Sequence, residues 1–412
     1  MVMIKKVLII IGFIAFAGFS QATENNCLIC HQDFEEEDGP SYKINRDIHT
    51  QKGIGCVDCH GGDTSLDDMD DVREEKSYVG VPTYSQVPEF CARCHSNAEY
   101  MHEFNPSLPT DQLERYKTSV HGKRLYRYKD KKVATCISCH SVHEIGNADM
   151  PLSSTYPINI PQTCGKCHSN KEYMDEYNIP TNQGSDYKQS IHGFALFELK
   201  DLSAPVCNDC HGNHGAAPPG VSSLTAVCGN CHAIEAELFD NSPHKSAYLK
   251  KDYPMCLTCH SNHKIIKPFD AMVGNTVTAL CTECHYEDDG TKGLETAFNI
   301  STAIRKLVAA HDEARKSLDA AAIKGMVTTD EEFRLKEVGQ ALIQVRTLVH
   351  SYNSDSVLPK AEEGILKAET VIANSGKLID EYYFRRKGLG LVTLIITIMA
   401  IAIYIKTKRV DE

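Results

Sequence analysis

The sequence contains no tryptophan, only 8% of its 412 residues are aromatic, and it has no excess of basic residues. The net charge of −12 argues against nucleic acid as a partner and favours basic partner proteins. None of the 18 cysteines lies outside one short repeated pattern. Because cysteines spaced in close pairs are typical of ligands, a disulfide framework is the weaker interpretation.

Long apolar segments are also scarce, since only two occur. The first, Val7 to Phe19, follows two lysines and precedes small residues, which predicts a secretory signal peptide over residues 1–22. An uncleaved membrane anchor is the alternative for this segment.

The second apolar segment runs from Leu389 to Ile405 and carries no charge. As a helix with a rise of ~1.5 Å per residue it reaches ~26 Å, enough to cross a bilayer core. It predicts a transmembrane helix over residues 388–405 and a cytoplasmic tail at 406–412, with a buried core helix as the alternative. Basic residues after the segment and aromatic residues before it fit this orientation.

All cysteines occur in nine copies of the pattern Cys-x-x-Cys-His. The two cysteines and the histidine of each copy are Cys27, Cys30 and His31; Cys56, Cys59 and His60; Cys91, Cys94 and His95; Cys136, Cys139 and His140; Cys164, Cys167 and His168; Cys207, Cys210 and His211; Cys228, Cys231 and His232; Cys256, Cys259 and His260; Cys281, Cys284 and His285. Two thiols at this spacing can bond the two vinyl groups of one haem, and the next residue then ligates the iron from below. Zinc ribbons and redox dithiols also use Cys-x-x-Cys, but neither needs a histidine after every pair. The pattern predicts nine covalently bound haems c, with these histidines as proximal ligands.

Ten histidines remain, and seven of them recur at fixed places in a repeat of two haem motifs. Those between the two motifs are His49, His121, His192 and His244, and those just after the second motif are His143, His214 and His263. The recurrence predicts that they ligate haem iron from the distal side, although the first repeat has Asp63 at the trailing position. His102, His311 and His350 lie outside the repeat and stay open as distal candidates. An iron with two histidine ligands has no open position for substrate, so such a haem transfers electrons.

The sequence predicts a mainly α fold with extensive loops, in which a haem-packed domain at residues 23–290 precedes a helical region at 291–387. In the helical region, helices are expected from about Thr296 to Lys324, ended by Gly325, and from about Asp330 to Tyr352. A third is expected to begin near Pro359 and to continue into the membrane span.

These motifs, with the Ser-x-His-Gly elements and the Cys-x-x-Cys-His-x-x-His variants, resemble the periplasmic multihaem cytochromes of anaerobically respiring bacteria. Within that group the chain resembles the cytochrome subunits of membrane quinol-oxidising complexes, which pass electrons from menaquinol to periplasmic carriers. The resemblance implies three kinds of partner: a quinol-oxidising or b-type cytochrome subunit in the membrane, periplasmic redox proteins, and the lipid bilayer. It also implies a location on the periplasmic side of the bacterial inner membrane.

Two functions remain open at this point. The first is electron conduction, indicated by enough histidines for two ligands at most haems. The second is an oxidoreductase for a small nitrogen or sulfur compound, since the helical tail is similar to that of nitrite reductases and hydroxylamine oxidoreductases. The reductases usually have lysine in place of the motif histidine at the catalytic haem, and no motif in this sequence does.

Overall fold

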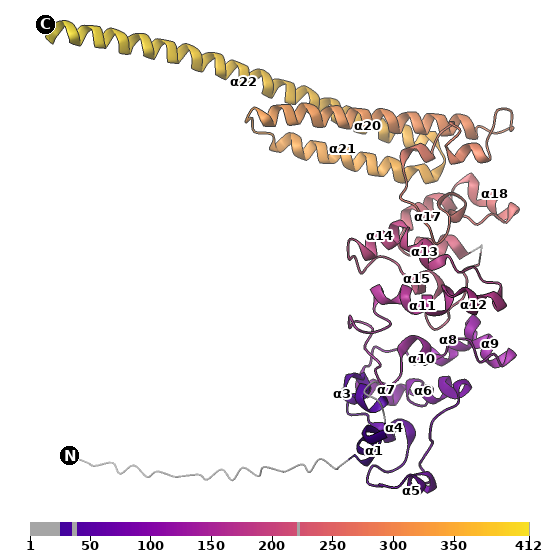
Figure 1. Ribbon diagram of the computed structural model, residues 1–412. Coiled ribbons are helices and arrows are strands. Elements are labelled where there is room, and N and C mark those ends of the chain that lie inside the picture. The colour runs from indigo at the N-terminus through magenta and orange to yellow at the C-terminus, as the bar shows by residue number, and fades with distance from the viewer. Residues whose placement is uncertain (1–24, 35–38, 221–222, 412) are drawn as a thin grey trace, which may run out of the picture. The chain divides into compact units, whose positions relative to one another are not determined.

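The computed structural model describes residues 25–34, 39–220 and 223–411, so the predicted signal peptide at 1–22 lies outside the described residues. The described residues form helices, turns and loops and contain no strand (Figure 1). The predicted mainly α fold with extensive loops is therefore confirmed. The chain divides into two compact units, one ending at Lys166 but including residues 212–217, the other formed by residues 167–211 and 218 onward.

The helices before residue 291 are short, at most nine residues each. They are α1 (Asn26–Phe34), α2 (Pro40–Lys43), α3 (Ile48–Gln51), α4 (Cys56–His60), α5 (Met69–Glu74), α6 (Val87–His95), α7 (Ala98–Phe104), α8 (Gln112–Thr118), α9 (Val120–Tyr128), α10 (Cys136–His140), α11 (Ile160–His168), α12 (Lys171–Met174), α13 (Gln183–Lys188), α14 (Ile191–Phe197), α15 (Cys207–His211), α16 (Leu224–Gly229), α17 (Ala233–Asp240), α18 (Pro243–Lys251) and α19 (Cys256–His260). Pro and Gly interrupt the sequence too often for longer helices.

This part of the chain has little apolar core of its own. Buried apolar side chains such as Met101, Leu125 and Leu196 are scattered along it. Among its described residues, the apolar cluster has four buried members, which are Leu224, Phe239, Tyr248 and Met255. The short helices therefore bury little apolar surface against one another, and porphyrin faces would supply the missing buried area.

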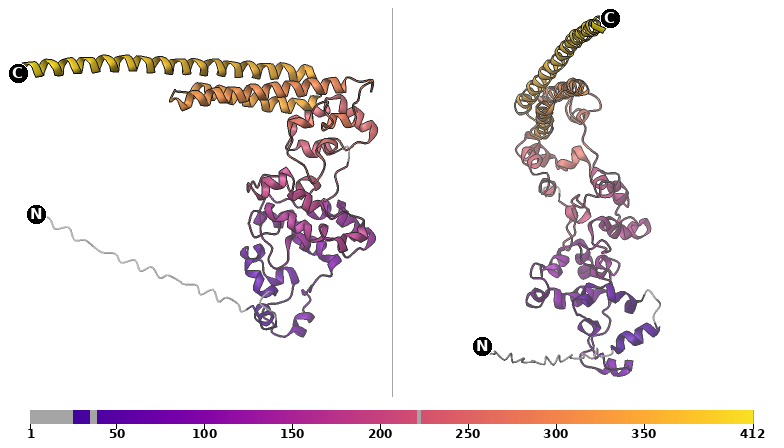
Figure 2. Two further views of the ribbon diagram at one scale, coloured as in Figure 1. Left: turned by 45° about the horizontal axis from the view of Figure 1, so that its top comes forward. Right: turned by 90° about the vertical axis from the view of Figure 1, so that its left-hand side faces the viewer.

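Residues 293 to 388 differ, because three long helices pack along one another here. They are α20 (Gly293–Ile323), α21 (Thr329–Leu348) and α22 (Ser354–Asp411), which lie side by side in both figures (Figures 1 and 2). Ile304, Leu307, Val338, Val345 and Val371 lie in a continuous apolar core between them. The three helices predicted from the sequence are confirmed, each within a few residues of its expected start.

Helix α20 ends where the sequence predicts. Gly325 follows its last turn with φ of 74°, a left-handed conformation that glycine adopts without steric cost and that commonly ends a helix. The second helix stops earlier than expected, because α21 passes into a 3₁₀ turn, η8 (Val349–Ser351), and Tyr352 then takes φ of 50°. This tight turn reverses the chain into α22.

Helix α22 continues without a break from the bundle into the apolar segment, as expected (Figure 2). The side chains from Leu389 to Ile405 are exposed, in contrast to those of a buried core helix. Long, apolar and uncovered, this end of α22 is a candidate membrane anchor.

Candidate haem sites

Four motifs form a single helical turn each, which are α4, α10, α15 and α19. The residue directly after each turn has a positive φ: 71° at Gly61, 69° at Ser141, 79° at Gly212 and 56° at Ser261. The chain therefore changes direction immediately after the motif histidine. In three of these motifs a trailing histidine follows the motif histidine by three residues, at His143, His214 and His263. The sharp turn lies between the two histidines and directs the trailing one away from its own motif.

The histidines between motifs are positioned by a local hydrogen-bonded frame, seen at α14. The Ser190 hydroxyl accepts from the Gly193 N–H at 2.9 Å and donates to the Tyr187 carbonyl at 2.6 Å, which caps the helix that begins at Ile191. A Cβ at Gly193 would overlap the Tyr187 carbonyl oxygen, so only glycine fits. The frame places His192 in the first turn of α14. It explains why Ser-x-His-Gly recurs, since α9 is built in the same way around His121.

Seven pairs of histidine rings lie with their centroids between 5.9 and 6.3 Å apart. The pairs are His95 with His49, His60 with His143, His140 with His214, His232 with His192, His211 with His263, His285 with His244, and His260 with His350. Each pair joins one motif histidine to one histidine outside the motifs. Six of the seven predicted repeat histidines are therefore brought to a motif histidine.

The spacing of these pairs fits an iron between the rings. Two imidazoles that each hold a metal through one nitrogen at roughly 2.0–2.1 Å have ring centroids about 6.4 Å apart. Burial also lowers the pKa of His95, His140 and His260, and it lowers the pKa of His244 to about 4. These rings are neutral near pH 7, which is the form that ligates a metal. The residues present thus fit haems with two axial histidines.

The pairing follows a register that interlocks neighbouring repeats. A histidine between two motifs pairs forward with the first motif of the next repeat, as His192 does with His232. A trailing histidine pairs backward with the second motif of the preceding repeat, as His263 does with His211. The sequence shows that these histidines recur but contains no signal for which motif each one faces.

The remaining histidines differ in their surroundings. His350 lies in η8 and pairs with His260, whereas His311 lies in α20 with its Nδ1 3.3 Å from Asp312. His102 is exposed on α7. His121 has the same place on α9 as His192 has on α14. Asp63, at the trailing position of the first repeat, accepts from the Ser65 N–H and hydroxyl at 2.8 Å and so caps a local turn.

Cysteines of consecutive motifs also lie close together within each unit. The thiol of Cys91 is hydrogen-bonded to that of Cys136, and Cys228 is hydrogen-bonded to Cys256. Burial raises the pKa of Cys59, and the neighbouring Cys94 thiol raises it further. Haems attached at these cysteines would be neighbours in the order of the sequence, which is the arrangement that stepwise electron transfer requires.

Three family models match parts of the chain. The model for cytochrome c3 matches residues 48–169, that for the doubled CXXCH motif matches residues 244–290, and that for cytochrome c554 and c-prime matches residues 16–61. No curated protein matches the chain. Together with the histidine pairs, the matches define the class: this is a multihaem c-type cytochrome. It binds haem c covalently and transfers electrons, and it carries a candidate membrane anchor at its C-terminal end.

The angles between paired rings predict two kinds of electron paramagnetic resonance (EPR) signal. The ring planes of His140 with His214 and of His211 with His263 are nearly parallel, at 13° and 15°. Those of His49 with His95 and of His244 with His285 are nearly perpendicular, at 82° and 87°. Parallel ring planes separate the energies of the iron dxz and dyz orbitals strongly. Perpendicular ring planes leave these two orbitals nearly equal in energy. We expect the oxidised protein to give ordinary rhombic low-spin signals together with two highly anisotropic ones at large g; their absence would contradict these two pairs.

Proposed function

We propose that the chain is a nine-haem electron conduit anchored in the bacterial inner membrane, with its haems on the periplasmic side. It would carry electrons from the quinol pool, through a membrane partner, to periplasmic acceptors in anaerobic respiration. The observation that supports this most directly is the set of seven histidine pairs. We assign as distal ligands the histidine of each pair that lies outside the motifs, together with His121, which is equivalent in position to His192. We assign neither His102 nor His311 to a haem.

Two axial imidazoles at each paired iron favour the conduit over an enzyme. A substrate such as nitrite or hydroxylamine must reach an open iron position, and a ring on each side leaves none. The alternative oxidoreductase is therefore the weaker proposal, since the pairs cover most of the motifs. When bound, the haems supply the one-electron chemistry; the chain's histidines hold each iron, and its cysteines fix the order of the haems.

The bundle supports a protein partner rather than direct reduction of the haems by quinol. Between Ser354, near the last motifs, and Leu389, where the apolar segment begins, α22 rises by ~50 Å at ~1.5 Å per residue. Because the helix is continuous, the bundle would hold the haems of the second unit far above the bilayer. A quinol head group at the membrane surface would then lie too far from them for efficient tunnelling, and a redox centre in a partner must bridge the gap.

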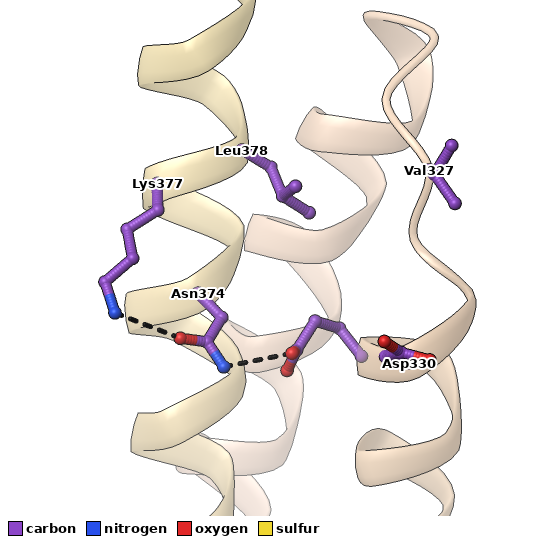
Figure 3. A pocket seen from close by; sticks show the side chains of 6 residues that line it. Val327, Asp330, Asn374, Lys377 and Leu378 are labelled. Carbon is purple, nitrogen blue, oxygen red and sulfur yellow. Dashed lines mark hydrogen bonds between the residues drawn. The ribbon is translucent and has the colours of Figure 1, made fainter.

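A groove in the bundle does not change this conclusion. It has a volume of about 280 Å³ and lies between the start of α21 and α22, where Asn374 donates to Glu331 at 2.9 Å (Figure 3). Val327 and Leu378 supply its apolar lining. Asn374 is 20 residues along α22 from Ser354, which corresponds to ~30 Å of helix. Electrons from a quinol bound in this groove would have to cross that distance.

The proposal is tested with the full haem-loaded chain in proteoliposomes that contain a reduced naphthoquinol. We expect the haems of the second unit to stay oxidised on the time scale of respiratory turnover, because the quinol head group lies too far from them. Co-reconstitution with a quinol-oxidising b-type cytochrome subunit should reduce all nine haems, and dithionite provides the full-reduction control. Rapid reduction by quinol alone would contradict the need for a partner, and turnover of nitrite, hydroxylamine or tetrathionate would contradict the conduit.

A further inference from the structure

The axial histidines differ in what their second ring nitrogen contacts. The Nδ1 of His60 lies 3.0 Å from the Gly80 carbonyl, and that of His350 lies 2.9 Å from the Thr347 carbonyl. The Nδ1 of His49 instead lies 2.8 Å from the Asp47 carboxylate, and that of His285 lies 2.8 Å from the Asp289 carboxylate. An imidazole that binds iron through Nε2 carries its proton on Nδ1, so in each case Nδ1–H donates. Two of these histidines thus donate to a neutral carbonyl and two to a carboxylate.

Both carboxylates are held in place by further hydrogen bonds. The side chain of Asp289 is 8% exposed, and its Oδ1 accepts from the Thr291 N–H at 2.7 Å and the Thr291 hydroxyl at 2.8 Å. This leaves Oδ2 for His285. The backbone at Gly293 also lies against the His285 ring, because a Cβ there would overlap the ring. Such a built contact differs from a surface ion pair, in which two flexible side chains meet by chance.

The contact between Asp47 and His49 is also held in place by further hydrogen bonds, although the sequence around it is different. The side chain of Asp47 is 5% exposed and caps α3, with Oδ1 accepting from the His49 N–H at 2.9 Å. Its Oδ2 accepts from the Ile145 N–H at 2.8 Å, which ties α3 to a distant loop of the same unit. The two contacts share a second property: His49 and His285 belong to the two pairs with perpendicular ring planes.

We propose that Asp47 and Asp289 are tuning residues that lower the reduction potentials of the haems bound at His95 and His285. A carboxylate draws the Nδ1 proton of the imidazole more strongly than a carbonyl does, which increases electron donation from Nε2 and stabilises Fe(III) over Fe(II). The step at each haem is the gain of one electron, Fe(III) to Fe(II), and the Nδ1 proton stays between ring and carboxylate. Each unit would then contain one haem of lowered potential beside one with a carbonyl partner. The inference rests on the axial ligands assigned under the proposed function.

Because perpendicular ring planes give distinctive EPR signals, these two haems can be followed separately from the others in the intact protein. A redox titration followed by EPR can track the two highly anisotropic signals apart from the others. In Asp289→Asn a single acceptor oxygen must replace the two that serve Thr291 and His285, so the hydrogen bond from His285 is weakened or lost. The midpoint of one of the two signals should therefore shift to higher potential while the other stays unchanged. Asp47→Asn should shift the other signal, which makes the second variant an independent test.

Asp288→Asn is the matched control. Asp288 is exposed and lies one residue from Asp289, so its substitution removes the same charge nearby. Asparagine tolerates the φ of 66° that Asp288 has. Loss of a charge near the surface would shift the midpoint in Asp288→Asn as well, whereas the proposed effect requires a clearly larger shift in Asp289→Asn. Equal shifts, or no shift in Asp289→Asn, would overturn the proposal.

Two further results distinguish a failure of the tuning role from a failure of the axial-ligand assignment on which it rests. A new high-spin signal in Asp289→Asn would show that Asp289 only holds the ligand in position, which would also overturn the tuning role. Absence of both anisotropic signals from the unmodified protein would instead show that the axial pairs are wrong. Iron content per chain and the far-ultraviolet circular dichroism spectrum confirm that each variant is folded and fully loaded.

Discussion

A chain produced without haem attachment is expected to be unfolded from residue 25 to about residue 290, while the bundle of α20, α21 and the first part of α22 remains helical. The first region buries too few apolar side chains to offset the backbone entropy of ordering, at ~1–2 kcal/mol per residue. The bundle has a continuous apolar core of its own. The effect is therefore predicted to be complete loss of structure in one region and little change in the other.

Limited proteolysis with mass spectrometry measures this directly. The chain is expressed with and without a functional haem-attachment system, and protected fragments are mapped in both samples. We expect the unloaded chain to be cut throughout residues 25–290 and to leave a fragment that begins near Gly293. The loaded chain is the control. Protection of the motif-bearing region in the unloaded chain would show that the polypeptide alone specifies that fold, against the packing argument made above.

The sequence predicted the parts of this molecule that depend on local patterns. Covalent attachment requires Cys-x-x-Cys-His within five residues, so the motifs are readable directly. The bundle helices follow from apolar periodicity, and Gly325 could be named as a stop because its left-handed φ is a local property. The repeat histidines were recognisable for a related reason, since the capping frame around His192 leaves a signature of serine and glycine.

Contacts between repeats could not be predicted in the same way. That His192 faces His232 rather than His211 depends on how two loops fold past each other, and no residue near either histidine encodes it. Asp289 follows His285 by four residues and looks like an ordinary loop acid until its hydrogen bonds with Thr291 are known. His350 and His311 were equivalent candidates in the sequence, because both lie on helices of similar composition.

Replacement of His350 with alanine is expected to convert one low-spin haem, that at Cys256 and Cys259, to a high-spin form. His350 is the ring that pairs with His260, at 6.2 Å and 22°, and its Nδ1 is oriented by the Thr347 carbonyl. Without it the iron keeps only the motif histidine and gains an open position. EPR and magnetic circular dichroism of the oxidised variant should show about one ninth more of the iron as high-spin than in the unmodified protein, since nine motifs are present.

His311→Ala is the matched control, because His311 is the other histidine of the bundle and contacts Asp312 on its own helix. We expect it to leave the spin state of every haem as it is in the unmodified protein. The comparison also tests why the bundle ends where it does. Arg346 binds Asp270 through two hydrogen bonds of 2.8 Å, and the Tyr352 ring lies 3.9 Å from that of His244, so the turn between α21 and α22 is fixed against the last motifs. If His350→Ala gained no high-spin haem, the bundle would only brace these haems. If it gained one, the bundle also supplies a ligand, and displacing the bundle would change the coordination of that iron.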